Sequence, residues 1–253
     1  MNSAQSIFSS IAAVNDKAIG LLRHSNDYAG AQVLLDDGLS KICEAFHTNA
    51  MAEEDDDNMW EENNNENLMI LQEERVCIGA TLVALDLPSS YTETSSFVIF
   101  RNAISIVHAP SPTVGTQSQT LEHALGLLEC AMFFNLGFAH HLQALASGNF
   151  QDLDTAADKY DTSLGMLADH EFIERTPFVT LMELALLNNG GQIDSLHFSI
   201  NKVHRCVYMM RSSLDQLLMS YGVIPLALPR ELTLFSMNIF MNMNHYARPS
   251  AAA

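Results

Sequence analysis

Residues 130–147 read C-A-M-F-F-N-L-G-F-A-H-H-L-Q-A-L-A-S and carry no formal charge. The absence of charge raises the question of a membrane span, and the adjacent His140 and His141 raise that of a metal or catalytic site. A membrane helix needs roughly 18 apolar residues in a row. Here Asn135 and Gln143 interrupt the stretch together with the histidines, and each polar side chain would need a partner in hydrocarbon. The stretch is therefore predicted to be a helix of a water-soluble domain.

The chain is strongly acidic, and its charge restricts the partners that can be expected. Its 253 residues include 30 Asp and Glu against 12 Lys and Arg, which gives a net charge of −18 at pH 7. Such a chain repels the phosphates that provide most of the affinity for nucleic acids, and it repels anionic membrane surfaces. We therefore expect a basic or apolar protein or peptide partner, no nucleic acid and no membrane, and leave the oligomeric state open.

The cysteines and the first residues bear on the compartment. The four cysteines form no C-x-x-C pair and are widely spaced, which favours a reducing compartment in which they serve as small apolar residues. Residues 1–14 contain no Lys or Arg and no continuous apolar run, so no signal peptide is expected. With no transmembrane segment expected either, the sequence predicts a cytoplasmic (or nuclear) protein.

Helical periodicity extends outward from the opening stretch in both directions. In residues 28–47, for example, apolar side chains recur at spacings of three and four, which is one face of a helix. Thr176 and Pro177 predict a helix start, with Thr as N-cap and Pro at the first helical position. The predicted helices are two within 15–49, broken near Asn26 and Asp27, and then one each over 119–147, 152–169, 177–193 and 199–221. Residues 229–246 leave two readings open: Pro229-Arg230-Glu231 suggests a helix start, which we favour, whereas residues 236–244 nearly alternate polar and apolar, as in a strand.

An acidic stretch separates the first two helices from the rest of the chain. From Glu53 it reads E-E-D-D-D-N-M-W-E-E-N-N-N-E-N, and its carboxylates repel one another. We predict an acidic disordered loop over residues 50–68. Trp60 within it is either a side chain that rests on the surface or part of a docking motif for a basic partner.

Two runs rich in β-branched residues follow, at 76–85 and 97–107. The residues that join them, D-L-P-S-S-Y-T-E-T-S-S, are typical of a loop. Two such runs and their connection predict a small β-hairpin insertion over 76–107. At the other end of the chain, residues 247–253 are expected to form a flexible tail.

The series of predicted helices contains three segments with a common pattern. Each matches part of a helix pair of about 34 residues in which small residues stand where the two helices cross. The matching residues are Asn26, Tyr28, Ala31 and Gly38 in the first segment, Leu136, Gly137, His140, Ala156 and Tyr160 in the second, and Gly190, Gly191 and Val203 in the third. On these residues the chain resembles tetratricopeptide repeat (TPR) proteins over 15–48 and 118–222. The second segment departs from the pattern by a longer turn, and the third by the choice of Gly190 and Val203.

A narrower resemblance rests on longer lines of sequence. These are N-D-K-A-I-G-L-L, F-N-L-G-F-A-H-H-L-Q-A-L and L-A-L-L-N-N-G-G-Q-I, together with the terminal alanines. In these features the chain is similar to the short TPR-like proteins that are numerous in algal genomes.

The TPR resemblance implies both a fold and a function. The fold is a single mainly α domain over residues 1–253, made of antiparallel helix pairs of the TPR-like or α-solenoid type with the β-hairpin as an insertion. The function is that of a non-catalytic protein–protein interaction module, a scaffold or adaptor, that binds a peptide or protein segment in a groove lined by the first helix of each pair. The groove residues would be Phe134, Asn135, Phe138, His141, Asn188, Asn189 and Gln192. Asn amides can donate to and accept from a peptide main chain; the alternative is that these residues pack against the hairpin or a loop of the same chain.

Two other functions stay open at this point. Glu44-x-x-His47 fits half of the carboxylate–histidine motif of helical-bundle di-iron proteins, with the looser match Asp194-x-x-His197 and the interior carboxylates Glu122, Glu129 and Glu183. A methionine-rich surface with Met237, Met241 and Met243 would suit a structural, self-associating protein. The sequence contains no nucleophile motif, phosphate loop or paired zinc ligands. We therefore expect no enzyme, no catalytic residues, no metal and no cofactor.

Overall fold

The computed structural model of the chain describes residues 3–54, 75–88, 97–109, 116–169, 176–221 and 229–246. These residues form seven helices and one small three-stranded antiparallel sheet, so the prediction of a mainly helical fold with a small β element is confirmed. The chain divides into two compact units. Unit 1 comprises Met1–Leu85 and Asn102–Ala139, and unit 2 comprises Asp86–Arg101 and His140–Ala253. That residues 1–253 act as one domain stays a prediction.

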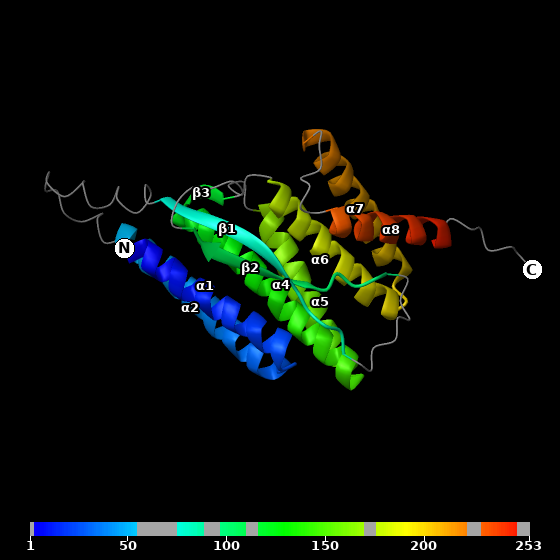
Figure 1. Ribbon diagram of the computed structural model, residues 1–253, viewed down its shortest axis with the longest axis horizontal. Coiled ribbons are helices and arrows are strands. Elements are labelled where there is room, and N and C mark those ends of the chain that lie inside the picture. The colour runs from blue at the N-terminus through cyan, green and yellow to red at the C-terminus, as the bar shows by residue number, and fades with distance from the viewer. Residues whose placement is uncertain are drawn as a thin grey trace, which may run out of the picture. The chain divides into compact units, whose positions relative to one another are not determined.

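Unit 1 begins with a helix pair, α1 (Ser3–His24) and α2 (Tyr28–Glu54), which pack side by side (Figure 1). The turn between them lies at the predicted break, and Asp27 is the N-cap of α2: the Gly30 N–H donates to Asp27 Oδ1 at 2.9 Å. The prediction of a loop from residue 50 is wrong at its start, because α2 continues to Glu54. The rest of the predicted acidic loop, Trp60 included, lies outside the described residues.

The sheet of unit 1 consists of β1 (Arg75–Ala84), β2 (Asn102–His108) and β3 (Thr116–Thr120), in the order β2-β1-β3. β1 pairs with β2 in an antiparallel register that places Leu82 opposite Ile104. The two β-type runs therefore do pair, but the second strand begins at Asn102 rather than at Phe97. β3 was not predicted, because its sequence T-Q-S-Q-T has no apolar alternation to signal a strand.

The helix α4 (Leu121–Ser147) contains the opening stretch, and the boundary between the two units falls inside it, after Ala139. Its unit 1 portion is buried almost all round, with Leu125, Leu128 and Ala131 fully inaccessible. This explains the lack of charge in the sequence: a helix that is apolar on every face is buried in a protein core or in a membrane. No helix in the described part of the chain has the length and hydropathy needed to cross a membrane.

Unit 2 continues with α5 (Phe150–Asp169), α6 (Pro177–Leu196), α7 (Ile200–Tyr221) and α8 (Pro229–Tyr246), each of the last three packed against the helix before it (Figure 1). Thr176 is the N-cap of α6, as predicted, and its Oγ1 accepts from the Val179 N–H at 3.2 Å. Residues 229–246, for which the sequence left helix and strand open, form the helix α8. The predicted tail, residues 247–253, lies outside the described residues.

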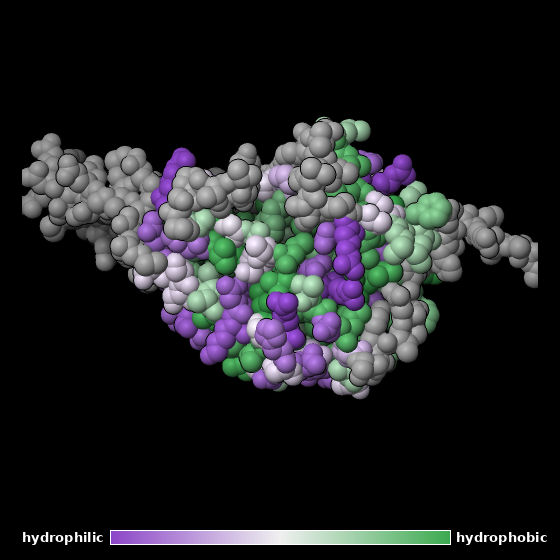
Figure 2. Space-filling view, viewed as in Figure 1, coloured by the Kyte–Doolittle hydropathy of each residue, from purple (hydrophilic) through white to green (hydrophobic). Residues whose placement is uncertain are grey.

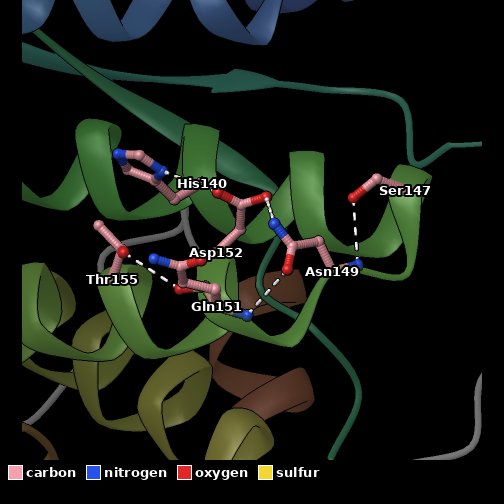
Figure 3. A network of polar contacts seen from close by, with 6 residues as sticks. All are labelled: His140, Ser147, Asn149, Gln151, Asp152 and Thr155. Atoms are coloured by element: carbon pink, nitrogen blue, oxygen red, sulfur yellow. Dashed lines mark hydrogen bonds and ion pairs between the residues drawn. The ribbon is translucent and has the colours of Figure 1, made fainter.

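The turn between α4 and α5 is held by a polar network that Figure 3 shows in close-up. Asn149 is central: its Oδ1 accepts from the Gln151 N–H at 3.1 Å and its Nδ2 donates to Asp152 Oδ2 at 3.0 Å (Figure 3). The other carboxylate oxygen of Asp152 lies 3.7 Å from His140 Nδ1. Asn149 is therefore the N-cap of α5, and it follows Gly148, whose φ of 74° ends α4.

Replacing Asn149 with alanine is expected to lower the free energy of unfolding by about 1 kcal/mol, the usual cost of removing an N-cap side chain. Urea denaturation followed by circular dichroism would measure the loss. Asn149→Ser keeps an oxygen acceptor for the Gln151 N–H without placing a second carboxylate beside Asp152, and it serves as the control, with stability expected close to wild type. Equal stability of the alanine variant and wild type would contradict the capping role.

Candidate functional site

Buried asparagine side chains are the most unusual polar feature of the helices. They lie on the first helix of each helix pair and on α8, and their exposed fraction is 0 %: Asn15 on α1, Asn135 on α4, Asn188 and Asn189 on α6, and Asn238 on α8. Burial of an amide is costly unless its donors and acceptor are hydrogen-bonded. The partners of these asparagines therefore indicate what the faces of these helices are built to hold.

In unit 1, Asn15 and Asn135 bind the main chain of Ile104, and we call these three residues the Asn135 cluster. Asn135 Oδ1 accepts from the Ile104 N–H at 2.9 Å, and Asn135 Nδ2 donates to Ile104 O at 2.7 Å. Asn15 Nδ2 donates to the same carbonyl oxygen at 3.0 Å, and Asn135 Nδ2 also donates to Asn15 Oδ1 at 2.8 Å. The amide of Asn135 thus binds both polar groups of one main-chain residue.

The Asn135 cluster also covers part of the free edge of the sheet, at Ile104. β2 pairs only with β1 among the described strands, so alternate N–H and C=O groups of β2 face away from its neighbour. An unpaired edge of this kind can pair with a strand from another chain. The asparagines supply the missing partners for Ile104, whose side chain is also buried.

In unit 2, Asn188, Asn189 and Asn238 bind residues 97–101, and we call the three asparagines the Asn188 cluster. Asn238 Oδ1 accepts from the Val98 N–H at 3.0 Å, and Asn238 Nδ2 donates to Val98 O at 2.8 Å. Asn188 Nδ2 donates to the same carbonyl oxygen at 3.0 Å, and Asn188 Oδ1 accepts from Asn238 Nδ2 at 2.6 Å. This set of four contacts repeats that of the Asn135 cluster, with Asn238 in the role of Asn135 and Asn188 in that of Asn15.

Asn189 holds the next alternate residue of the same segment. Its Oδ1 accepts from the Phe100 N–H at 2.9 Å, and its Nδ2 donates to Phe100 O at 3.0 Å. Val98 and Phe100 are two residues apart, so in an extended backbone their N–H and C=O groups face the same side. Side chains of α6 and α8 therefore bind residues 97–101 much as a neighbouring strand would.

The two aromatic side chains of residues 97–101 pack against helices of unit 2. The ring of Phe97 lies against Gly191 of α6: a Cβ added to this glycine would come within 2.8 Å of Phe97 Cζ. The ring of Phe100 stacks on Phe235 of α8, with centroids 5.4 Å apart and an interplanar angle of 28°. Phe97, Ile99 and Phe100 are buried, whereas Arg101 is exposed.

All seven residues predicted to line a groove are buried and present no open surface in this conformation: Phe134, Asn135, Phe138, His141, Asn188, Asn189 and Gln192. Asn135, Asn188 and Asn189 bind a peptide main chain, but it is the chain's own. Phe134 and Phe138 pack as a tilted ring pair with centroids 6.0 Å apart. The alternative in which such residues pack against the same chain describes these contacts better than an open groove does.

Sequence reasoning missed Asn15 and Asn238. Both are buried polar residues of helices whose apolar positions predict a core-facing side. In α8, Asn238 lies on the face that also carries Leu232, Phe235 and Ile239, at spacings of three and four. An asparagine inside an apolar stripe was the available signal, since a buried amide requires a specific partner.

His141 is buried in unit 2, and its Nδ1 lies 3.3 Å from the hydroxyl of Tyr160 on α5. Burial disfavours the imidazolium and lowers the pKa of His141 from 6.5 to about 3. Burial likewise raises the pKa of Tyr160. Both side chains are therefore neutral near pH 7, which suits a role in packing and hydrogen bonding.

The pKa of His141 predicts an acid-sensitive fold. The unfolded chain binds a proton at this position below pH 6.5 and the folded chain does not, so the free energy of unfolding falls as the pH falls through this range. Between pH 6.5 and 5 the expected loss is about 2 kcal/mol. Denaturation midpoints measured across this range would show it.

The control for this prediction isolates His141 from other titrating groups. Burial raises the pKa of the Glu129 and Asp194 carboxyls. At lower pH these two groups therefore raise the free energy of unfolding as the pH falls, which is opposite to the effect of His141. The His141→Gln variant should lose the slope between pH 6.5 and 5, whereas His24→Gln, at an exposed position of α1, should retain it. An unchanged slope in His141→Gln would assign the pH dependence elsewhere.

A groove with a volume of about 390 Å³ lies between α5, α6 and α7 of unit 2 and contains Asp161, Asp194, Lys202, Arg205 and Cys206 among its lining residues. Burial, with Asp194 next in effect, raises the pKa of Cys206 to about 12. The thiol is therefore protonated near neutral pH, whereas a reactive cysteine needs the thiolate. The groove offers mixed charges without an activated nucleophile.

The residues of the predicted di-iron motif do not gather into a site. Glu44 and His47 are exposed on α2. Within the described ranges no group of three or more His, Cys, Asp or Glu side chains is placed to hold a metal ion. The described geometry thus gives the metal-binding alternative no support.

In comparisons of the chain with known proteins, no family model, no curated protein and no solved structure matched it. The interpretation of the two asparagine clusters therefore depends only on the contacts described above.

Proposed function

We propose that this protein is a non-catalytic interaction module of TPR-like helix pairs that binds an extended segment of a partner protein. The short turns inside the pairs α1–α2, α4–α5 and α6–α7 support the TPR-like assignment. So does the placement of the asparagines, since in TPR-type stacks the first helix of each pair lines the concave side. The scaffold would act by holding a partner, not by changing it chemically.

The observation that carries the proposal is the way Asn135, Asn189 and Asn238 each bind both the N–H and the C=O of one main-chain residue. Such contacts recognise an extended backbone without reading its side chains, which is the physical basis of recognition by strand addition. Specificity then comes from side-chain positions beside the amides. The segment held in unit 2, F-V-I-F from Phe97, is uncharged, which favours an apolar over a basic partner segment.

Affinity capture with matched variants tests the proposal. The bait is the full chain as wild type, as Asn189→Ala, or as Asn201→Ala, which alters an exposed asparagine of α7. We expect the partner to be retained by wild type and Asn201→Ala and lost from Asn189→Ala. Circular dichroism at the capture temperature shows whether each bait is folded, and a folded Asn189→Ala bait that retains every partner would contradict the proposal.

A second candidate, self-association, is favoured by the outer face of α8. Phe240 is 69 % exposed, and Met237, Met241 and Met243 are exposed beside it. Figure 2 shows hydrophobic residues reaching the surface where α8 lies in Figure 1. Light scattering over a range of concentrations would detect association, and Phe240→Glu should abolish it; a monomer at every concentration would remove this candidate.

A further inference from the structure

We propose that the Asn188 cluster, with Gly191 and Phe235 beside it, is a binding site for an extended Phe-x-x-Phe peptide, and that residues 97–101 are its internal occupant. A partner segment of the same chemistry would bind by displacing this occupant. The inference rests on the proposed function and deepens it, because it names the class of peptide and the residue that each part of the site contacts.

The main-chain contacts of the site can be transferred from one peptide to another. Val98 and Phe100 contribute only their N–H and C=O groups to the bonds with Asn188, Asn189 and Asn238. Any extended peptide carries the same groups at the same two-residue spacing. An incoming segment therefore replaces each bond with an equal one, and no buried amide is left unpaired.

The ring positions supply the sequence preference. Gly191 leaves room for the ring of Phe97, and Phe235 offers a stacking surface to Phe100. An aromatic side chain contributes a large buried area and a further stacking term. Arg101 is exposed, so the site does not discriminate between residues at the position after the second aromatic side chain. The peptide class is therefore Phe-x-x-Phe with an uncharged centre.

Residues 97–101 are held by side chains and lie outside the ladder of the sheet. The ladder of β2 with β1 begins at Asn102, whereas the main-chain groups of Val98 and Phe100 are hydrogen-bonded to the side chains of Asn188, Asn189 and Asn238. The occupant's advantage over a free peptide is its covalent attachment, which corresponds to an effective concentration in the millimolar range for short flexible connections. Wild type should accordingly bind free peptide weakly, and a weakened occupant should raise the affinity.

Peptide binding to the full chain tests the inference. The probe is a fluorescently labelled peptide S-S-F-V-I-F-R-N, the sequence of residues 95–102, and the proteins are wild type and Phe97→Ala. The variant's own segment cannot fill the position beside Gly191, whereas the probe can. We expect the peptide to bind Phe97→Ala at least about tenfold more tightly than wild type, and at about 100 times its Kd to raise the variant's Tm by about 5 °C.

Modified peptides show whether the bonds to asparagine carry the binding. N-methylation at the position of Phe100 removes the N–H that donates a hydrogen bond to Asn189 Oδ1. This change should weaken binding by about tenfold or more. N-methylation at the position of Ile99, whose N–H faces the other side of an extended backbone, is the matched control and should weaken it less. Equal losses for the two modified peptides would overturn the proposed geometry.

Two further results decide the proposal. If Phe97→Ala does not fold, Phe97→Leu provides a milder weakening of the occupant, and the same difference in affinity is expected. A folded variant that binds the peptide no better than wild type overturns the inference. This failure is distinct from failure of the proposed function: a partner captured by wild type but lost from Asn189→Ala would leave protein binding standing while the Phe-x-x-Phe class falls.

Discussion

Replacing Asn135 with alanine is expected to lower the free energy of unfolding by about 3 kcal/mol or more. The variant loses the acceptor for the buried Ile104 N–H and the donor to Asn15 Oδ1. Each buried polar group left without a partner costs about 1–3 kcal/mol. A cavity at a fully buried position adds to this loss. Urea denaturation followed by circular dichroism and by fluorescence would measure it.

The control for this prediction is Asn201→Ala, an asparagine of α7 that is exposed. Its free energy of unfolding should stay within about 0.5 kcal/mol of wild type, as is usual for surface substitutions. A loss of stability in Asn135→Ala no larger than that of the control would show that solvent, and not Asn135, supplies the hydrogen-bond partners of the Ile104 N–H and C=O.

Alanine at Gly191 and alanine at Gly190 should change stability in opposite directions, with a difference of about 2 kcal/mol that equals the cost of overpacking at Gly191. A Cβ at Gly191 would lie 2.8 Å from Phe97 Cζ and 3.3 Å from Cys206 Cβ, whereas a Cβ at Gly190 meets no atom within 4 Å. Overpacking of a core typically costs about 1–3 kcal/mol. Alanine in place of glycine inside a helix stabilises by about 1 kcal/mol, which is the whole effect expected at Gly190.

The two glycine variants share a helix and differ by one position, so thermal unfolding of both under the same conditions measures the contact with Phe97 directly. A third variant, Gly191→Ala combined with Phe97→Leu, removes the ring atoms that the new Cβ would meet. It should recover part of the loss seen in Gly191→Ala. Stabilisation by both single variants would mean that Phe97 does not lie against α6 as described.

The helices were largely predictable because their signals are local. Spacings of three and four marked the buried faces, and Thr176 and Pro177 marked the start of α6. The end of α2 was misplaced because the acidic composition after Ala52 overrode the helical pattern that continues to Glu54. β3 was missed since its residues are polar and its partner, β1, is distant in sequence.

The candidate site was predictable in its chemistry but not in its occupant. That Asn135, Asn188 and Asn189 bind main chain follows from the amide group, and their placement on first helices followed from the repeat pattern. Asn15 and Asn135 reach the same carbonyl from positions 89 and 31 residues away from Ile104, and such pairings leave no periodic trace in a single sequence. The run F-V-I-F was taken for part of a strand, because an extended segment held by side chains has the same composition as one held by a ladder.

The pairing of Ile104 with asparagines also has a consequence for synthesis of the protein. Translation delivers Asn15 and all three strands before α4, which begins at Leu121. Until α4 has left the ribosome, the Ile104 N–H lacks the acceptor that Asn135 provides in the finished protein. In a nascent chain that stops at Thr120, the Ile104 N–H at the edge of the sheet would therefore be open to pairing with another chain. Protection of this edge position depends on α4, the helix that follows the sheet.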